Sequence, residues 1–167
     1  GDIKALWNVL GVDFSGERMD GPMPVYEIVY QNYTPLPKLA QLTERSPEFV
    51  FVDKGCGAKE PLNEKSEITS GLQHLLFPFP GYVRQLHAAD DSLEFTALVK
   101  TGPRTGYVNT RDMVDAMPFG PRRLNDQRPH FPTKDSYVLA AQIRGRLRPA
   151  KPMAGEDKAE AKAAEAA

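Results

Sequence analysis

A glycine-rich turn at 53–59 has the strongest chemical signature in this sequence, because it follows an apolar run and contains two lysines. Such turns cradle phosphate groups in α/β folds, where backbone N–H groups point at the anion. The spacing does not fit the phosphate motifs, since Glu60 stands where a P-loop needs Ser or Thr. The turn is therefore predicted to be structural, with Gly55 and Gly57 adopting positive φ angles.

Nucleophilic and metal chemistry have less support. Cys56, the only cysteine, would need a neighbouring base, for which the sequence offers His74, His87 and His130. No catalytic signature surrounds Cys56, and the histidines lack the spacing of a zinc site. We therefore expect a protein that is not an enzyme and that has no catalytic residues, cofactor or metal.

Length and charge exclude further classes. The chain has 167 residues and a net charge of −1, which favours one globular domain without a membrane span or a disulfide framework. Residues 1–99 contain 8 basic and 14 acidic side chains, whereas residues 100–148 contain 10 and 4. The basic half lacks the interleaved aromatic residues of a nucleic-acid interface, so we expect no nucleic-acid partner. Its charges are expected to be solvated or paired with the acidic half, and the alternative is that they bind an anionic partner.

One segment has the pattern of a helix and four have that of strands. Ile3, Leu6, Trp7 and Leu10 recur at helical spacing before Gly11, which predicts a helix over 3–10. Apolar runs and alternating β-branched and aromatic residues predict strands. The strand predicted at 49–52 is continuously apolar, which is typical of a strand buried on both faces. The expected strands are 25–30, 49–52, 93–99 and 137–143.

The connections are long and rich in proline and glycine. Thr69 or Ser70 is expected to cap one helical turn before the prolines that follow it. The side chains of that turn expected to face the core are Leu72, Leu75 and Leu76. A further short helix is expected at 112–117, inside the long connection 103–135.

The chain resembles a known family in several short segments. The most telling are Ile-Thr-Ser-Gly-Leu-Gln at 68–73 and Phe-Pro-Gly at 79–81, and others are 30–39, 48–53 and 137–145. In this order they resemble the gliding-motility-type auxiliary component of bacterial ABC transporters. The resemblance implies an α/β fold, with a Rossmann-like or flavodoxin-like partial sheet, short helices and long Pro/Gly-rich loops.

The resemblance also implies a place and partners. Residues 1–148 are expected to be an α/β domain that is a fragment of a larger extracytoplasmic domain, followed by an Ala/Glu/Lys-rich linker at 149–167. The parent would be anchored on the extracytoplasmic side of the bacterial inner membrane, with this fragment itself soluble and not inserted. Its expected partners are the permease and ATPase subunits of the same transporter, or a second copy of this chain.

Function is then expected to lie in loops that make contacts. The residues predicted to make contacts are Thr69, Ser70, Gly71, Gln73, Arg122 and Arg123. A purely structural role for the first three, as caps and a close-packing point, remains open. Two other functions also remain open: an α/β enzyme or nucleotide-binding domain whose site lies partly upstream, and a glycan-binding module. Aromatic residues available for stacking on a sugar are Trp7, Tyr30, Tyr33 and Tyr82.

Overall fold

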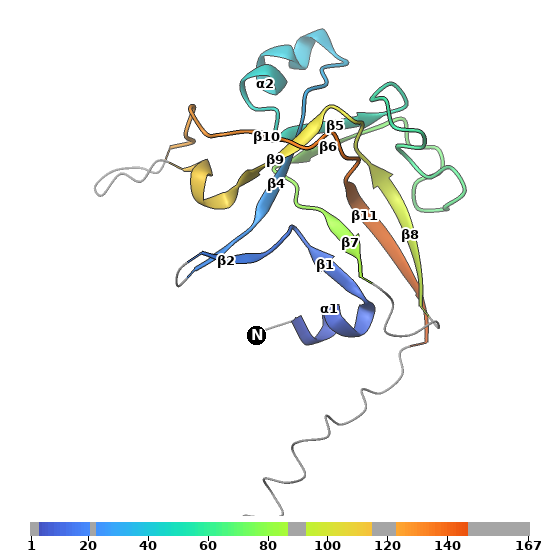
Figure 1. Cartoon of the computed structure of the whole chain (residues 1–167). Helices are drawn as coiled ribbons and strands as arrows, with labels where there is room; N and C mark the ends of the chain where they lie inside the picture. The colour runs from blue at the N-terminus through green and yellow to red at the C-terminus, as the bar shows by residue number, and fades with distance from the viewer. Residues whose placement is uncertain (1–3, 21–22, 87–92, 115–122, 147–167) are drawn as a thin grey trace, which may run out of the picture.

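A computed structural model describes residues 4–20, 23–86, 93–114 and 123–146 (Figure 1). Within these ranges no helix is long and apolar enough to cross a membrane. The linker predicted at 149–167 lies outside them. In chain order the elements are α1 (Lys4–Leu10), β1 (Val12–Phe14), β2 (Arg18–Asp20), β3 (Met23–Val25), β4 (Glu27–Gln31), η1 (Pro37–Leu39), α2 (Ala40–Arg45), β5 (Phe49–Asp53), β6 (His74–Pro78), β7 (Val83–Gln85), β8 (Leu93–Lys100), β9 (Thr105–Asn109), η2 (Thr110–Met113), β10 (Phe131–Pro132) and β11 (Val138–Gly145).

The described strands form five small sheets in which every pair is antiparallel. β1 pairs with β7, β2 with β3, β5 with β6 and β8 with β11, and β9 lies between β4 and β10. The predicted Rossmann-like or flavodoxin-like α/β fold is therefore wrong. A parallel sheet needs crossovers of a dozen or more residues, usually helical. The α-helices described have only seven and six residues, so the fold is mostly β.

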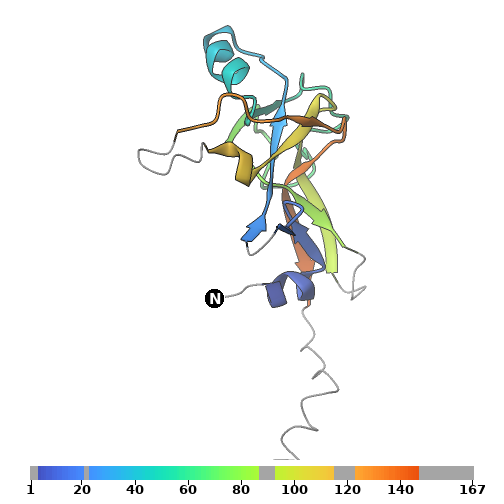
Figure 2. The ribbon, with the colours of Figure 1, turned by 60° about the vertical axis from the view of Figure 1, so that its left-hand side comes forward.

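All four predicted strands are present, but they do not share one sheet. They correspond to β4, β5, β8 and β11, and only β8 and β11 pair with each other. Figures 1 and 2 show these two side by side as a long twisted ribbon. The predicted connection 103–135 contains β9, which is the central strand of a sheet. The helix predicted at 112–117 is instead the short 3₁₀ helix η2, and its residues from 115 on lie outside the described ranges.

The helical turn predicted after Thr69 is also wrong. Gly71 adopts a φ of 85°, and the chain then enters β6, which pairs with β5. Alternation along this strand turns Leu75 toward the core, whereas Leu76 is exposed. Leu72 is exposed as well. Of the three leucines expected to face the core, only Leu75 does so, because the period of the segment is two rather than 3.6.

The main core lies where β4, β5 and β8 meet. Its fully buried side chains include Val29, Val50, Val52 and Val99. Phe51, on the opposite face of β5 from Val50 and Val52, is also buried, which confirms that β5 is covered on both faces. The buried amide of Gln31 joins these strands: its Nε2 donates to the carbonyl of Phe51 at 2.8 Å, and its Oε1 accepts from the N–H of Gly102 at 2.8 Å. One polar side chain thereby satisfies backbone groups from two other segments.

The predicted N-terminal helix is confirmed as α1. Gly11 follows it with a φ of 66°, as expected for a glycine that ends a helix. Trp7 packs on Phe14 of β1, with ring centroids 4.7 Å apart. In Figure 1 α1 lies at the end of the molecule opposite α2.

Candidate functional site

Of the four predicted contact residues in segment 68–73, one is buried and three are exposed. Thr69 is buried, and its hydroxyl donates to the carbonyl of Asn63 at 2.6 Å, so its role is structural. Ser70, Gly71 and Gln73 are exposed. A Cβ on Gly71 would meet nothing within 4 Å, so this glycine is required by its positive φ and not by close packing.

Apolar side chains accompany these exposed polar residues. Ile68 is 56% exposed, Leu76 41% and Leu72 39%. Phe79 is also exposed, although its ring packs on Phe49 at 4.9 Å. We call these four residues the β6 surface. Single exposed leucines are ordinary, but four large apolar residues within a twelve-residue stretch are characteristic of interaction sites.

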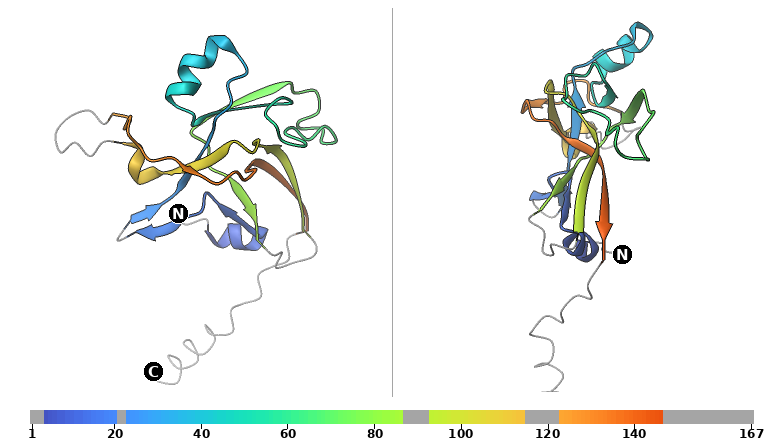
Figure 3. Two further views of the ribbon diagram at one scale, coloured as in Figure 1. Left: turned by 45° about the horizontal axis from the view of Figure 1, so that its top comes forward. Right: turned by 90° about the vertical axis from the view of Figure 1, so that its right-hand side faces the viewer.

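The β6 surface includes a strand edge. β6 pairs with β5 on one side, and among the described residues no backbone hydrogen bond reaches its other side. Figure 3 shows this strand at the outer side of the molecule in its right-hand view. Alternate backbone groups of β6 are therefore available to another strand, except at Pro78, which has no N–H to donate. Segment 74–78 contains no lysine, which protects many edge strands, and its one edge-protecting residue is Pro78 at its end.

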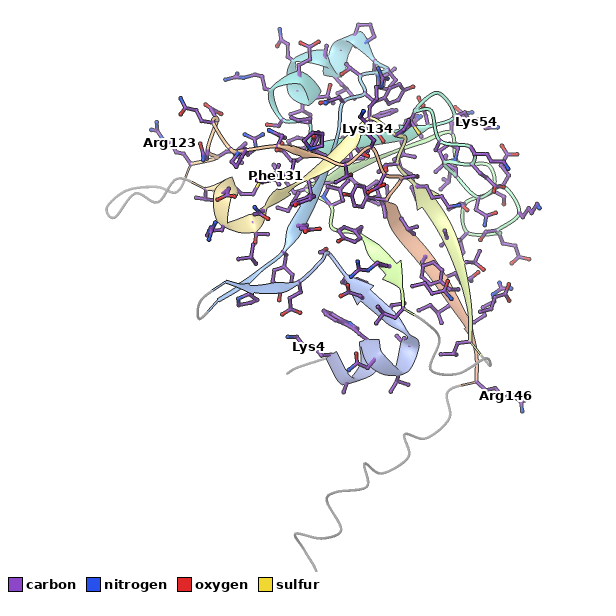
Figure 4. The ribbon with its side chains drawn as sticks, in the orientation of Figure 1. Lys4, Lys54, Arg123, Phe131, Lys134 and Arg146 are labelled. Carbon is purple, nitrogen blue, oxygen red and sulfur yellow. The ribbon has the colours of Figure 1, made fainter. Side chains whose placement is uncertain are left out.

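The two predicted arginine contacts are not part of this surface. Arg123 is exposed and lies at the end of the molecule opposite Lys54 in Figure 4. Arg122 lies outside the described residues. The structure therefore separates Arg123 from the contact residues of segment 68–73, with which the sequence grouped it.

The glycine-rich turn at 53–59 is held by its own side chains. Asp53 Oδ1 accepts from Tyr33 Oη at 2.8 Å and from the N–H of Gly55 at 2.7 Å. Burial, and then the bond to Asp53, raises the pKa of Tyr33 to about 12. Of the two glycines predicted to have positive φ, only Gly57 does, at 91°. Gly55 instead makes room for Tyr33, whose Oη would lie 2.5 Å from a Cβ there.

Cys56 belongs to the hydrophobic core. Its side chain is buried and packs in the same cluster as Val52 and Leu62. Within the described ranges no group of three His, Cys, Asp or Glu side chains is placed to hold a metal ion.

A buried ion pair joins Glu48 and Arg128, and the sequence did not predict that these two residues meet. Glu48 and Arg128 are both buried, with Arg128 Nε and Nη2 each 2.6 Å from a different carboxylate oxygen of Glu48. His130 Nε2 lies 2.9 Å from the same carboxylate. The expectation that arginines of the basic half pair with the acidic half thus holds for Arg128. The sequence offered one signal for it: an acidic residue directly before the most apolar strand.

The charge of Glu48 is stabilised where it is buried. Burial by itself raises the pKa of this carboxyl, but the hydrogen bonds from Arg128 and the backbone, with the charge of Arg128, outweigh it and lower the pKa below its ordinary value. Arg128 also donates to the carbonyl of Asn125 at 2.8 Å. The pair therefore fastens the connection before β10 to the turn before β5.

The aromatic residues considered for glycan stacking pack against separate neighbours. Tyr30 is buried and meets the His130 ring edge-on at 4.8 Å. Tyr33 is bonded to Asp53, and Tyr82 Oη donates to Glu27 at 2.8 Å. None of these contacts forms a shared, open stacking face among the described residues.

Comparison with known proteins gives one match. A family model described as "ABC-type uncharacterized transport system" matches residues 25–167, which includes every described element from β4 onward. The β6 surface, the glycine-rich turn and the buried ion pair all lie within the match. No curated protein and no solved structure matches the chain.

Proposed function

The chain belongs to a family of auxiliary components of ABC-type transport systems, and on that premise we propose that it acts by binding a protein subunit of the same transporter and catalyses no reaction. Within the family we assign it to the gliding-motility type. The domain would work on the extracytoplasmic side of the bacterial inner membrane, as part of a membrane-anchored parent. The permease subunit is then the expected direct partner, because permeases expose loops on that side.

The observation that supports this proposal is the β6 surface. It combines an open strand edge with exposed apolar side chains from one short segment of chain. A partner strand can add to such an edge through main-chain hydrogen bonds, while alternate side chains supply specificity. Ser70, Gly71 and Gln73, the exposed part of the predicted contact segment, adjoin the same strand.

The test is co-purification of the whole transporter. The ATPase, the permease and the auxiliary protein that contains this domain are co-expressed, extracted in detergent and isolated through a tag on the permease. Leu76→Glu places a charge in the middle of the β6 surface and should weaken the association by about 30-fold, the effect of losing roughly 2 kcal/mol at an interface hot spot.

Leu6→Glu is the matched control. Leu6 is 48% exposed on α1, at the other end of the molecule, so it receives the same change on a similarly open site. This variant should co-purify like the wild type. Equal loss with both variants, or loss with Leu6→Glu alone, would contradict a role for the β6 surface.

Self-association is the competing use of the same edge. Sedimentation equilibrium of the chain alone measures it directly. A dimer that Leu76→Glu dissociates would assign the β6 surface to a second copy of this chain and not to the permease.

A further inference from the structure

A basic cavity lies where three segments distant in the sequence meet. It has a volume of about 510 Å³ and is lined by Lys59 from the glycine-rich turn, Lys100 at the end of β8 and Lys134 before β11. Figure 4 shows Lys134 near the upper end of β8, on the side of the molecule that also carries Lys54. Gly102 and Ser136 are among the other residues that line it.

The positive charge of this cavity is only partly neutralised by its own lining residues. Among the described residues, none of the three lysine ammonium groups has an acidic side chain within ion-pair distance. Glu60 also lines the cavity, which leaves three positive charges against one negative. The neighbouring hollow differs, because Lys54 and Glu64 form an ion pair in its wall.

The backbone around the lysines is closely packed. A Cβ on Gly102 would lie 1.8 Å from the carbonyl oxygen of Cys56, so two loops touch through their main chains. Ser136 Oγ donates to the carbonyl of Thr101 at 2.5 Å, which fixes the strand that follows Lys134. The lysines are therefore carried by a preformed frame, and binding an anion would not require that frame to rearrange.

Lys134 has an unusual conformation for its residue type. Its φ is 63°, in the left-handed region, and its N–H donates to the carbonyl of Thr105 at 3.3 Å. Non-glycine residues adopt this region rarely and mainly where the surrounding structure imposes it. Here the conformation holds a lysine at the rim of a cavity that two other lysines share.

We propose that this cavity binds a phosphate-bearing anion through Lys59, Lys100 and Lys134. A compact ammonium group recognises phosphate as a point charge, and three of them from separate segments can surround one group. The volume suits a small headgroup, either of a free phosphorylated molecule or of a phospholipid. This inference is independent of the β6 surface, which lies on other residues.

The soluble source is tested by titrating the chain with inorganic pyrophosphate and with glycerol phosphate, followed by calorimetry or amide chemical shifts. The lipid source is tested by sedimentation with phosphatidylcholine vesicles that contain or lack phosphatidylglycerol. Lys100→Gln and Lys134→Gln should each weaken binding about tenfold, as expected when one charged hydrogen bond is lost. Binding should also weaken as salt is raised.

Lys38→Gln is the matched control, since Lys38 is exposed on η1 and lines none of the cavities described here. It removes the same charge and should leave binding unchanged. Binding of the soluble probes alone would support a free anion, and binding of the anionic vesicles alone would support a phospholipid headgroup. The proposal is overturned if neither source binds, or if Lys38→Gln weakens binding as much as the cavity variants.

Discussion

The buried ion pair and the β6 surface use their side chains in opposite ways. At Glu48 and Arg128 two charged groups lie inside the protein, and each finds its partner there. On the β6 surface each of the four large apolar side chains is more than a third exposed. Both arrangements depart from the usual distribution of polar and apolar residues.

The difference indicates which region serves stability and which serves binding. A buried charge that has lost its partner is strongly destabilising, so the ion pair must remain intact for the fold. An exposed leucine contributes little to folding, and several exposed apolar side chains beside an open edge are typical of a surface that binds a partner. The two regions should therefore respond differently to substitution.

The largest effect is expected at Arg128. Arg128→Met leaves Glu48 buried without its cation and should lower the free energy of unfolding by about 3–5 kcal/mol. Urea denaturation followed by circular dichroism measures it. Arg123→Met, on an exposed arginine of the same connection, should change stability by less than about 0.5 kcal/mol. A loss below about 1 kcal/mol for Arg128→Met would mean that the pair is not desolvated in solution.

Neighbouring leucines on β6 provide the next contrast. Leu75→Ala removes a side chain that packs on the core and should destabilise the protein by about 2 kcal/mol. Leu76→Ala removes one from the open face and should cost less than about 0.5 kcal/mol. Thermal unfolding of the two variants checks the register of the strand. Equal effects would show that the two faces of β6 are not distinguished as described.

The dependence of stability on pH tests the ion pair through a smaller effect whose direction can be predicted. Because Arg128 lowers the pKa of Glu48 in the folded protein, the carboxylate stabilises the fold above its unfolded pKa of about 4.5. That contribution is lost as the pH falls through the lower, folded pKa. Arg128→Met removes the strongest group that lowers the Glu48 pKa and leaves the backbone hydrogen bond and His130 to act against burial. The Glu48 pKa should therefore rise, and the slope of stability against pH near 4.5 should become smaller. Urea midpoints between about pH 3 and 6 measure both slopes, and parallel slopes would contradict the assignment.

Local sequence pattern was sufficient to predict several of the elements. β5 is apolar on both faces and β8 alternates, and each signal lies within a few adjacent residues. The helical stripe before Gly11 predicted α1 for the same reason. The family, too, was recognisable from short segments, and the match over 25–167 confirms an auxiliary component of an ABC-type transport system.

Local sequence pattern could not predict which strands pair with each other. The sequence predicted one α/β sheet, whereas β5 pairs with β6 and β4 pairs with β9. Local pattern assigned part of β6 to a helical turn and missed β9. β9 contains a glycine and an asparagine, and it is a strand because its neighbours on both sides supply the hydrogen bonds.

By itself the sequence determined where most of the well-covered strands and the first helix lie, and to which family the chain belongs, because those signals are local. Only the tertiary structure decided which strands pair, that Glu48 meets Arg128 across 80 residues, and that three lysines share one cavity. Each of these depends on contacts between segments far apart in the chain. Such contacts form only when the whole domain buries its core, and no window of neighbouring residues contains them.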